Sequence, residues 1–165
     1  MPITLAPELL AAMEQHASLE IGNGVVYLAA YSWARANSFE GFSKRWRNDA
    51  QDEFAHAQNF VKFVARYHVA IAPTVVLAGG VSGVVSIQSL AELAAMLEAV
   101  TEESMRTLVA TAEKTGDAAA VEWLSGKLLD QQKERKKADD FTARVRGLSP
   151  DGLTIMDRKI EKGGW

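Results

Sequence analysis

Apolar side chains recur every three to four positions over four long stretches of the chain, which is the pattern of amphipathic α-helices. In the first stretch the apolar stripe runs from Leu9 to Ala29 and predicts a helix over about residues 7–37. The segment Gly22-Asn23-Gly24 contains an Asn-Gly pair, which is common in hairpins, and each helical glycine costs about 0.8–1 kcal/mol relative to alanine. Because the stripe keeps its phase across these glycines, we expect one continuous helix.

The same periodicity predicts a second helix at about 39–67 and a fourth at about 118–147. A third helix of about 27 residues is expected to start at Ser89 and Glu92, whose spacing is that of a capping box, and to end before Gly116. The turn at 149–151 predicts a short fifth helix at about 152–162. Residues 68–86 are rich in β-branched residues and glycine, and they predict a long, ordered crossover.

Short links within each pair of long helices and one long link between the pairs are typical of a helix bundle. The predicted fold class is therefore all-α: an antiparallel four-helix bundle with a long crossover between the second and third helices and a short fifth C-terminal helix. We expect one domain over 1–165, with the bundle at about 7–147. An α-solenoid is the alternative fold, but it needs a repeat of about 30–45 residues, and the sequence shows none.

The amino-acid composition excludes several kinds of protein and of functional site. The 165 residues are 48% hydrophobic and 24% charged, which suits one folded domain. The chain has no cysteine, which excludes disulfides, a thiolate nucleophile and cysteine-ligated metals. A net charge of −3 argues against a nucleic-acid partner. The longest uncharged run contains Pro73 and glycines, and no secretory signal is evident, so we expect a cytoplasmic protein without a membrane partner.

Charged residues on inward helix faces are the candidates for chemistry, because a bundle core should be apolar. Each long helix has such residues near its middle, and antiparallel packing brings the four middles to one level. Several buried carboxylates with one imidazole suit iron, manganese or zinc, and a bridging carboxylate makes a paired site natural. Histidines 16 and 68 are expected at the surface or an interface. The candidate set is Glu20 and Tyr27, Glu53 and His56, Glu102, and Gln131 and Glu134.

The series Glu20 … Tyr27, Asp52-Glu53-Phe-Ala-His56, Glu102 and Gln131-Gln-Lys-Glu134 resembles the bacterial-type non-haem ferritins over essentially the whole chain. The resemblance implies a cage of twenty-four subunits that oxidises Fe(II) with dioxygen, or peroxide, and stores ferric mineral. It implies a di-iron site and, for the residues of this chain, three roles. Glu20, Glu53 and His56 would hold the first iron. Glu53, Glu102 and Glu134 would hold the second. Gln131 and Tyr27 would be the neighbouring hydrogen-bonding and redox-active residues.

Three departures refine this expectation. Bacterioferritins repeat Glu-x-x-His on the last bundle helix, where this chain has Gln131 and Glu134, and no methionine stands at the haem-ligand place beside Asp52, so we expect no haem. Asp52 and Asp130 match a third iron site found in many bacterial ferritins. Lys133 stands where that site usually has another acid, so a third site should be weak or absent.

Two other functions remain open from the sequence. One is a non-catalytic cage whose metal residues are vestigial. The other is a di-iron oxidase that acts on an organic substrate, which would need an internal pocket beside the metals. The leading hypothesis is a ferroxidase and iron store whose partners are Fe(II), dioxygen or peroxide, and further copies of the chain.

Overall fold

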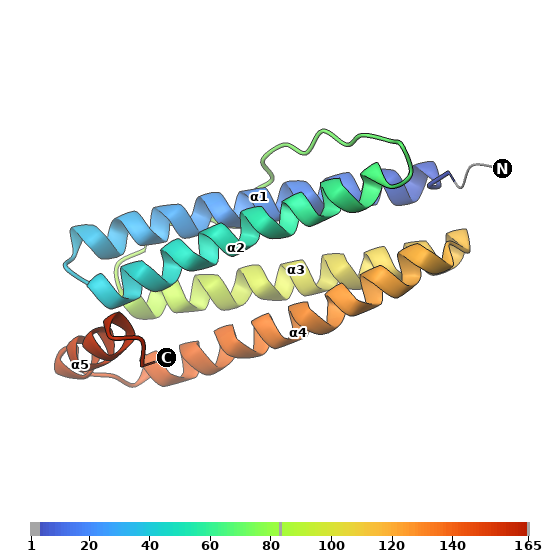
Figure 1. Ribbon diagram of the computed structural model, residues 1–165. Coiled ribbons are helices and arrows are strands. Elements are labelled where there is room, and N and C mark those ends of the chain that lie inside the picture. Colours follow the sequence, from blue (N-terminus) through green and yellow to red (C-terminus); the bar gives the residue numbers. More distant parts are fainter. Residues whose placement is uncertain (1–3, 83, 165) are drawn as a thin grey trace.

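The computed structural model describes residues 4–82 and 84–164, and these contain five helices and no strand (Figure 1). The five helices are α1 (Pro7–Ala36), α2 (Glu40–Ala65), α3 (Ile87–Thr115), α4 (Ala118–Arg146) and α5 (Pro150–Glu161). Helices α1 and α2 form one antiparallel hairpin and α3 and α4 form another, and the crossover between them runs outside the bundle along α1. The predicted all-α bundle is therefore confirmed. Within the described residues, no helix combines the length and apolar character that crossing a membrane requires.

Helix α1 is continuous through the glycine segment, as predicted, and both glycines lie where another chain segment comes close. A Cβ at Gly22 would lie 1.8 Å from the carbonyl oxygen of Val76 in the crossover. A Cβ at Gly24 would lie 2.7 Å from the ring of Phe54 on α2. The amide of Val76 also donates a 3.1 Å hydrogen bond to the carbonyl of Ser18. The glycines thus allow the crossover and α2 to pack directly on the α1 backbone.

The start of α3 was predicted too late. Ser86, not Ser89, is the N-cap: its hydroxyl accepts from the Ser89 amide at 3.1 Å, and the Ser89 hydroxyl accepts from the Ser86 amide at 3.1 Å. The helix begins at Ile87 because this residue is buried and extends the apolar stripe by one turn. At the other end, Gly116 has φ of 72°, the left-handed conformation that favours glycine at a helix end.

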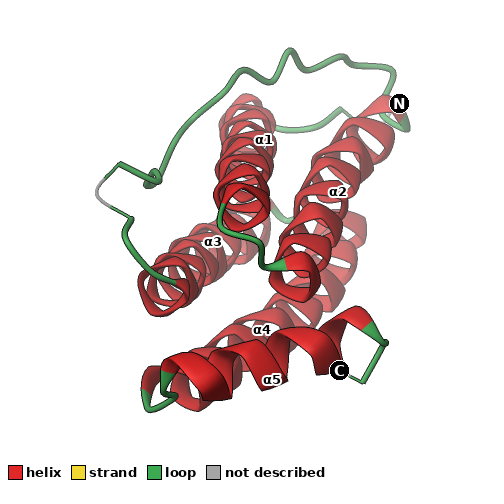
Figure 2. Cartoon of the chain, turned by 90° about the vertical axis from the view of Figure 1, so that its left-hand side faces the viewer, coloured by secondary structure: helices red, strands yellow, loops and turns green. Residues whose placement is uncertain are grey.

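The core is divided into two apolar clusters by a polar layer in the middle of the bundle. One cluster contains Phe42, Trp46 and Phe141, and the other contains Leu9 and Phe60. Helix α5 lies across the end of the bundle that the first cluster fills (Figure 2). The buried carboxylate of Asp157 on α5 fastens it there by accepting a 2.8 Å hydrogen bond from the Phe42 amide. Both ends of the bundle are thus packed, and the polar side chains gather between them.

Candidate metal centre

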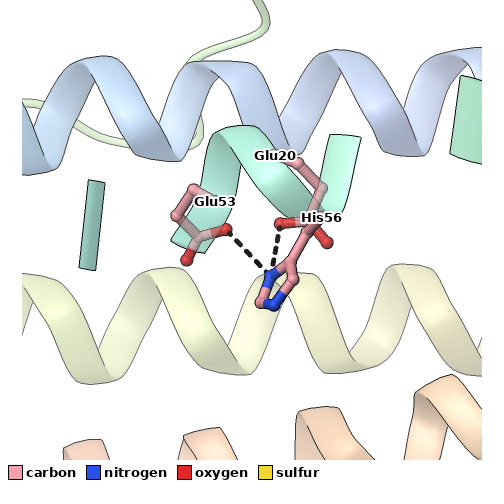
Figure 3. A group of neighbouring side chains, drawn as sticks. All are labelled: Glu20, Glu53 and His56. Atoms are coloured by element: carbon pink, nitrogen blue, oxygen red, sulfur yellow. Dashed lines mark ion pairs between the residues drawn. The ribbon is translucent and has the colours of Figure 1, made fainter. Parts of the chain in front are cut away.

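Glu20 of α1 and Glu53 and His56 of α2 point toward one another in the middle of the bundle (Figure 3). One potential ligand atom from each of the three lies within 4.8 Å of the other two. Nδ1 of His56 is 3.8 Å from Oε2 of Glu53 and 4.0 Å from Oε2 of Glu20. The residues at 53 and 56 converge because positions three apart on a helix share a face. Both carboxylates are buried, whereas the imidazole is one quarter exposed.

Burial and mutual repulsion set the protonation of this cluster. Burial raises the pKa of Glu20 and raises that of Glu53 well above its usual range. For His56, burial opposes the charge, but the nearby Glu53, Glu20 and Glu134 carboxylates outweigh it and raise its pKa to about 9. At pH 7 the cluster therefore carries protons that balance part of its negative charge, as a bound cation would.

Two oxygen atoms in the cluster are left without a protein partner. Oε2 of Glu20 and Oε2 of Glu53 are both buried, and neither has a hydrogen-bond partner among the described residues. A buried acceptor without a partner costs about 1–3 kcal/mol. These are also the two oxygens nearest Nδ1 of His56. Carboxylate oxygens with one imidazole nitrogen form a donor set that suits iron, manganese or zinc, so the residues fit a divalent cation.

Helix α4 adds a third carboxylate on the far side of the imidazole. Oε1 of Glu134 is 3.4 Å from Nε2 of His56, and its side chain is one third exposed. Burial raises the pKa of Glu134. A cavity of about 200 Å³ opens beside this group and is lined by Glu20, His56, Gln131, Glu134 and three lysines. The cluster is therefore reached from the α4 side.

Glu102, which was predicted as a ligand, pairs with two arginines in the structure and is not part of the cluster. One oxygen of its carboxylate accepts from both Nε and Nη2 of Arg106, one turn on, and the other accepts a 3.1 Å hydrogen bond from Nη1 of Arg135 on α4. The hydrogen bond from Arg106 and then that from Arg135 lower the pKa of Glu102. Two guanidinium groups thus satisfy this carboxylate and direct it away from the three residues of Figure 3.

Glu98, one helical turn earlier, takes the place predicted for Glu102. Its side chain is buried, and Oε1 accepts a 2.7 Å hydrogen bond from the Tyr27 hydroxyl. Oε2 accepts a 2.7 Å hydrogen bond from Nε2 of Gln131. Burial and the charge of Glu53 raise the pKa of Glu98 to about 7. The structure therefore brings Tyr27 and Gln131 together around Glu98, a carboxylate that was not among the sequence candidates.

One sequence signal separates the two acids on α3. Glu98 and Glu102 lie on the same apolar stripe, so periodicity alone does not distinguish them. However, Arg106 follows Glu102 by four residues, a spacing at which oppositely charged helical side chains pair. No basic residue lies three or four positions after Glu98. An acid with its own basic partner is a weaker candidate for a cation site.

The residues of the predicted third site lie in different places. Asp130 is exposed and accepts a 3.0 Å hydrogen bond from the Lys133 ammonium, which lowers its pKa. Asp52 is also exposed and lines a second cavity, of about 110 Å³, with Asp49 and Arg45. Burial raises the pKa of Asp49 to about 6. The Lys133 ammonium therefore pairs with Asp130, one of the two carboxylates of the predicted third site.

His16 was predicted at the surface or an interface, and this prediction is wrong: its side chain is fully buried. Nδ1 is 2.7 Å from the Ser104 hydroxyl oxygen, and Nε2 is 3.0 Å from Oε1 of Glu20. The ring also packs against Phe60, with 4.7 Å between ring centroids. Burial lowers the pKa of His16 to about 4, so the ring is neutral at pH 7. Its spacing of four residues before Glu20 was the signal that could have placed it.

A four-helix bundle with a carboxylate and histidine cluster midway along its helices defines the class of protein. The chain belongs to the ferritin-like domain family, whose pattern matches residues 10–148. No curated protein sequence matches significantly. Among solved structures, the chain is similar to an open-pore ferritin from the hyperthermophilic archaeon Archaeoglobus fulgidus, at TM-score 0.88 and 21% identity over 95% of this chain and 96% of that one.

Two further structures show the same fold. A humanized archaeal ferritin matches at TM-score 0.89 and 22% identity, over 96% of this chain and 98% of that one. A variant of the ferritin PmFTN, crystallised and soaked in iron, matches at TM-score 0.86 and 24% identity, over 92% of this chain and 98% of that one. At these identities the likeness establishes the fold and not the function.

Proposed function

We propose that this protein is a cytoplasmic ferroxidase that oxidises Fe(II) at a paired-iron site and stores the ferric product inside a cage of identical subunits. One observation carries the proposal: the unpartnered buried oxygens of Glu20 and Glu53 beside His56. Uncompensated buried carboxylates destabilise a bundle core, and a cation between them removes that cost. Membership of the ferritin-like family agrees with this function.

The proposed ligands come from all four long helices. Glu20, Glu53 and His56 would hold the first iron, as expected from the sequence. Glu53, Glu98 and Glu134 would hold the second, with Glu98 replacing Glu102. Each carboxylate oxygen of Glu98 already accepts one hydrogen bond and keeps a lone pair for a cation. Tyr27 and Gln131 would then fix the orientation of this ligand rather than bind iron themselves.

Iron is the substrate of this reaction, and the chain contributes position and charge. Two Fe(II) ions held side by side can each give one electron to dioxygen, which takes up two electrons and two protons to become hydrogen peroxide. Carboxylate ligands stabilise Fe(III) more than Fe(II), because the attraction grows with the charge of the ion, and this favours oxidation. Glu134, which is one third exposed, would let the ferric product leave on the α4 side.

The decisive experiment is to add Fe(II) to the protein in air and follow the ferric absorbance. The wild type should oxidise several equivalents of iron much faster than buffer, and the ferric iron should stay soluble with the protein. Glu53→Ala should abolish the fast phase, and Glu122→Ala, which changes an exposed acid, should keep it. If the wild type is no faster than buffer, the metal residues are vestigial and the protein is a non-catalytic cage.

Assembly into a homo-oligomer is supported by the surface. Leu28 on α1 and Val75 and Leu77 on the adjoining crossover are about 40–60% exposed in the single subunit. Exposed apolar residues of this kind mark protein contacts. We propose that copies of the chain cover them in a twenty-four-subunit cage. Gel filtration should give a mass many times the 18.0 kDa of one chain. Elution at the mass of a single chain would exclude the cage.

The cavities beside the cluster weaken the case for an organic-substrate oxidase. The cavity at Glu134 is lined by Lys127, Lys133 and Lys137, and the second one by Arg45, Asp49 and Asp52. Organic substrates are held mainly by apolar and aromatic linings, with only a few polar groups. A charged lining suits ions better.

A further inference from the structure

The two oxygens of Glu20 have different surroundings. Oε1 is 3.0 Å from Nε2 of His16 in the bundle interior. Oε2 has no hydrogen-bond partner among the described residues and lies 4.0 Å from Nδ1 of His56. One oxygen of this carboxylate is therefore held by the protein, and the other faces the proposed iron site.

His16 is fixed on each side. Ser104 of α3 contacts Nδ1 at 2.7 Å, Glu20 of α1 contacts Nε2, and Phe60 of α2 packs against the ring. The side chain is fully buried, so it has no water to turn toward. A neutral imidazole has one N–H group and one acceptor nitrogen. A cation requires Glu20 as a carboxylate, which only accepts hydrogen bonds. The proton must then lie on Nε2, and the Ser104 hydroxyl must donate to Nδ1.

We propose that His16 is a positioning residue for iron binding: it donates Nε2–H to Oε1 of Glu20 and so orients the carboxylate with Oε2, the unpartnered oxygen beside His56, toward the cation. The proposal rests on the assignment of Glu20 as a ligand in the proposed function. Ser104, which is only partly buried on α3, selects the tautomer of His16 through its hydrogen bond. The chain Ser104–His16–Glu20 thus extends the metal centre from the core toward the outer side of the bundle.

This arrangement assigns different duties to the two buried carboxylates. With Oε1 held by His16, the orientation of Glu20 is fixed and Oε2 is directed to one ion. Glu53 has no such partner on Oε2 and is free to share its oxygens between two ions. Partners that fix a metal ligand in this way typically change metal affinity or activity by about 10–100-fold when they are removed.

Co(II) tests the proposal without iron oxidation, because its visible absorption reports both affinity and coordination geometry. His16→Leu removes the donor at similar volume, and we expect it to weaken the tighter Co(II) site by about 10–100-fold and to change its spectrum. His16→Gln keeps an N–H donor and should recover most of the affinity. Ser104→Ala should weaken binding less, in the same direction, because the tautomer is then no longer fixed.

Thr101→Ala is the matched control. Its hydroxyl accepts a 2.8 Å hydrogen bond from Asn23, another buried polar contact between α1 and α3. This variant should lose stability as Ser104→Ala does, yet bind Co(II) as the wild type does. Thermal unfolding and circular dichroism establish that each variant is folded.

The outcomes separate the two proposals. If the wild type binds no Co(II), the proposed metal centre fails, and the role of His16 with it. If the wild type binds Co(II), and folded His16→Leu binds it with the same affinity and spectrum, only the role of His16 is overturned. Should His16→Leu fail to fold, Ser104→Ala compared with Thr101→Ala decides, and equal Co(II) affinity in these two variants contradicts the proposal.

Discussion

The hydroxyl of Tyr27 on α1 donates a 2.7 Å hydrogen bond to the buried carboxylate of Glu98 on α3. Gln131 of α4 donates to the other oxygen of the same carboxylate. One acidic side chain therefore connects three of the four long helices beside the Glu20, Glu53 and His56 cluster. A carboxylate in this position can act both as a ligand and as a structural link.

Substitution of the two acids on α3 should give opposite results for cation binding. Glu98→Ala should reduce the number of Co(II) ions bound per chain from two to one, because it removes a ligand of the proposed second ion. Glu102→Ala should keep two, because its carboxylate is paired with Arg106 and Arg135. Isothermal titration calorimetry measures the number bound. Loss of an ion in Glu102→Ala with none lost in Glu98→Ala would contradict the assignment.

The metal-free protein should become less stable as pH rises from about 4.5 to 7. Burial raises the pKa of Glu98 to about 7, so over this range the folded state keeps a proton that the unfolded state has lost. The stability lost through this group is about 3 kcal/mol at full ionisation. Urea unfolding in a chelator at several pH values measures the effect.

Glu98→Gln is the control for this pH dependence. The amide can accept from Gln131 and donate to the Tyr27 oxygen, so the hydrogen bonds persist without a titrating group. We expect its stability to vary less with pH than that of the wild type. An equal slope in both proteins would show that the dependence arises elsewhere.

Cation binding should tighten as pH rises toward 9. Burial lowers the pKa of His56, but the neighbouring carboxylates outweigh it and raise this pKa to about 9, so below this pH a cation must displace its proton. Each displaced proton makes the apparent Kd about tenfold tighter per pH unit. Zn(II) titration at pH 6, 7 and 8 tests this, and an affinity that does not change with pH would contradict it.

Much of the fold and part of the site follow from local sequence signals. The helices are visible in the apolar periodicity, and Glu53 and His56 are visible in their spacing. Glu98 and Glu102 are one turn apart on the same stripe, and Arg106 is the only local signal that separates them, whereas Arg135 reaches Glu102 from α4 only in the folded chain. The burial of His16 likewise depends on its contact with Ser104, 88 residues away. Short-range patterns do not contain such contacts.

The glycines of the long helices should respond differently to alanine. Gly22→Ala places a Cβ 1.8 Å from the Val76 carbonyl, so the crossover must move away, at a cost of about 1–3 kcal/mol. Gly126 of α4 has no atom within 4 Å of such a Cβ, and Gly126→Ala should stabilise the protein by about 1 kcal/mol through helix propensity. Thermal unfolding of both variants measures the contrast, and stabilisation by Gly22→Ala would refute the close packing.

Lys133→Glu should strengthen a third cation site. The ammonium of Lys133 holds the Asp130 carboxylate at 3.0 Å and repels cations, and its replacement gives two adjacent acids near the cavity at Glu134. Calorimetry should detect one additional Co(II) ion per chain in this variant. Lys136→Glu is the control, because that lysine pairs with Asp140. An extra ion in the control alone would contradict the role given to Lys133.

The contact between Gly22 and the crossover limits how the proposed iron site can deform. Two residues beyond Glu20, the α1 backbone lies between the crossover outside it and the bundle core inside it, so it cannot shift outward. Iron contracts when it is oxidised, and its ligands must follow. That adjustment then falls on the opposite wall, where the Glu134 side chain is one third exposed. In the proposed centre, the α1 side would therefore stay fixed during oxidation, and the α4 side would adjust to the smaller ferric ion.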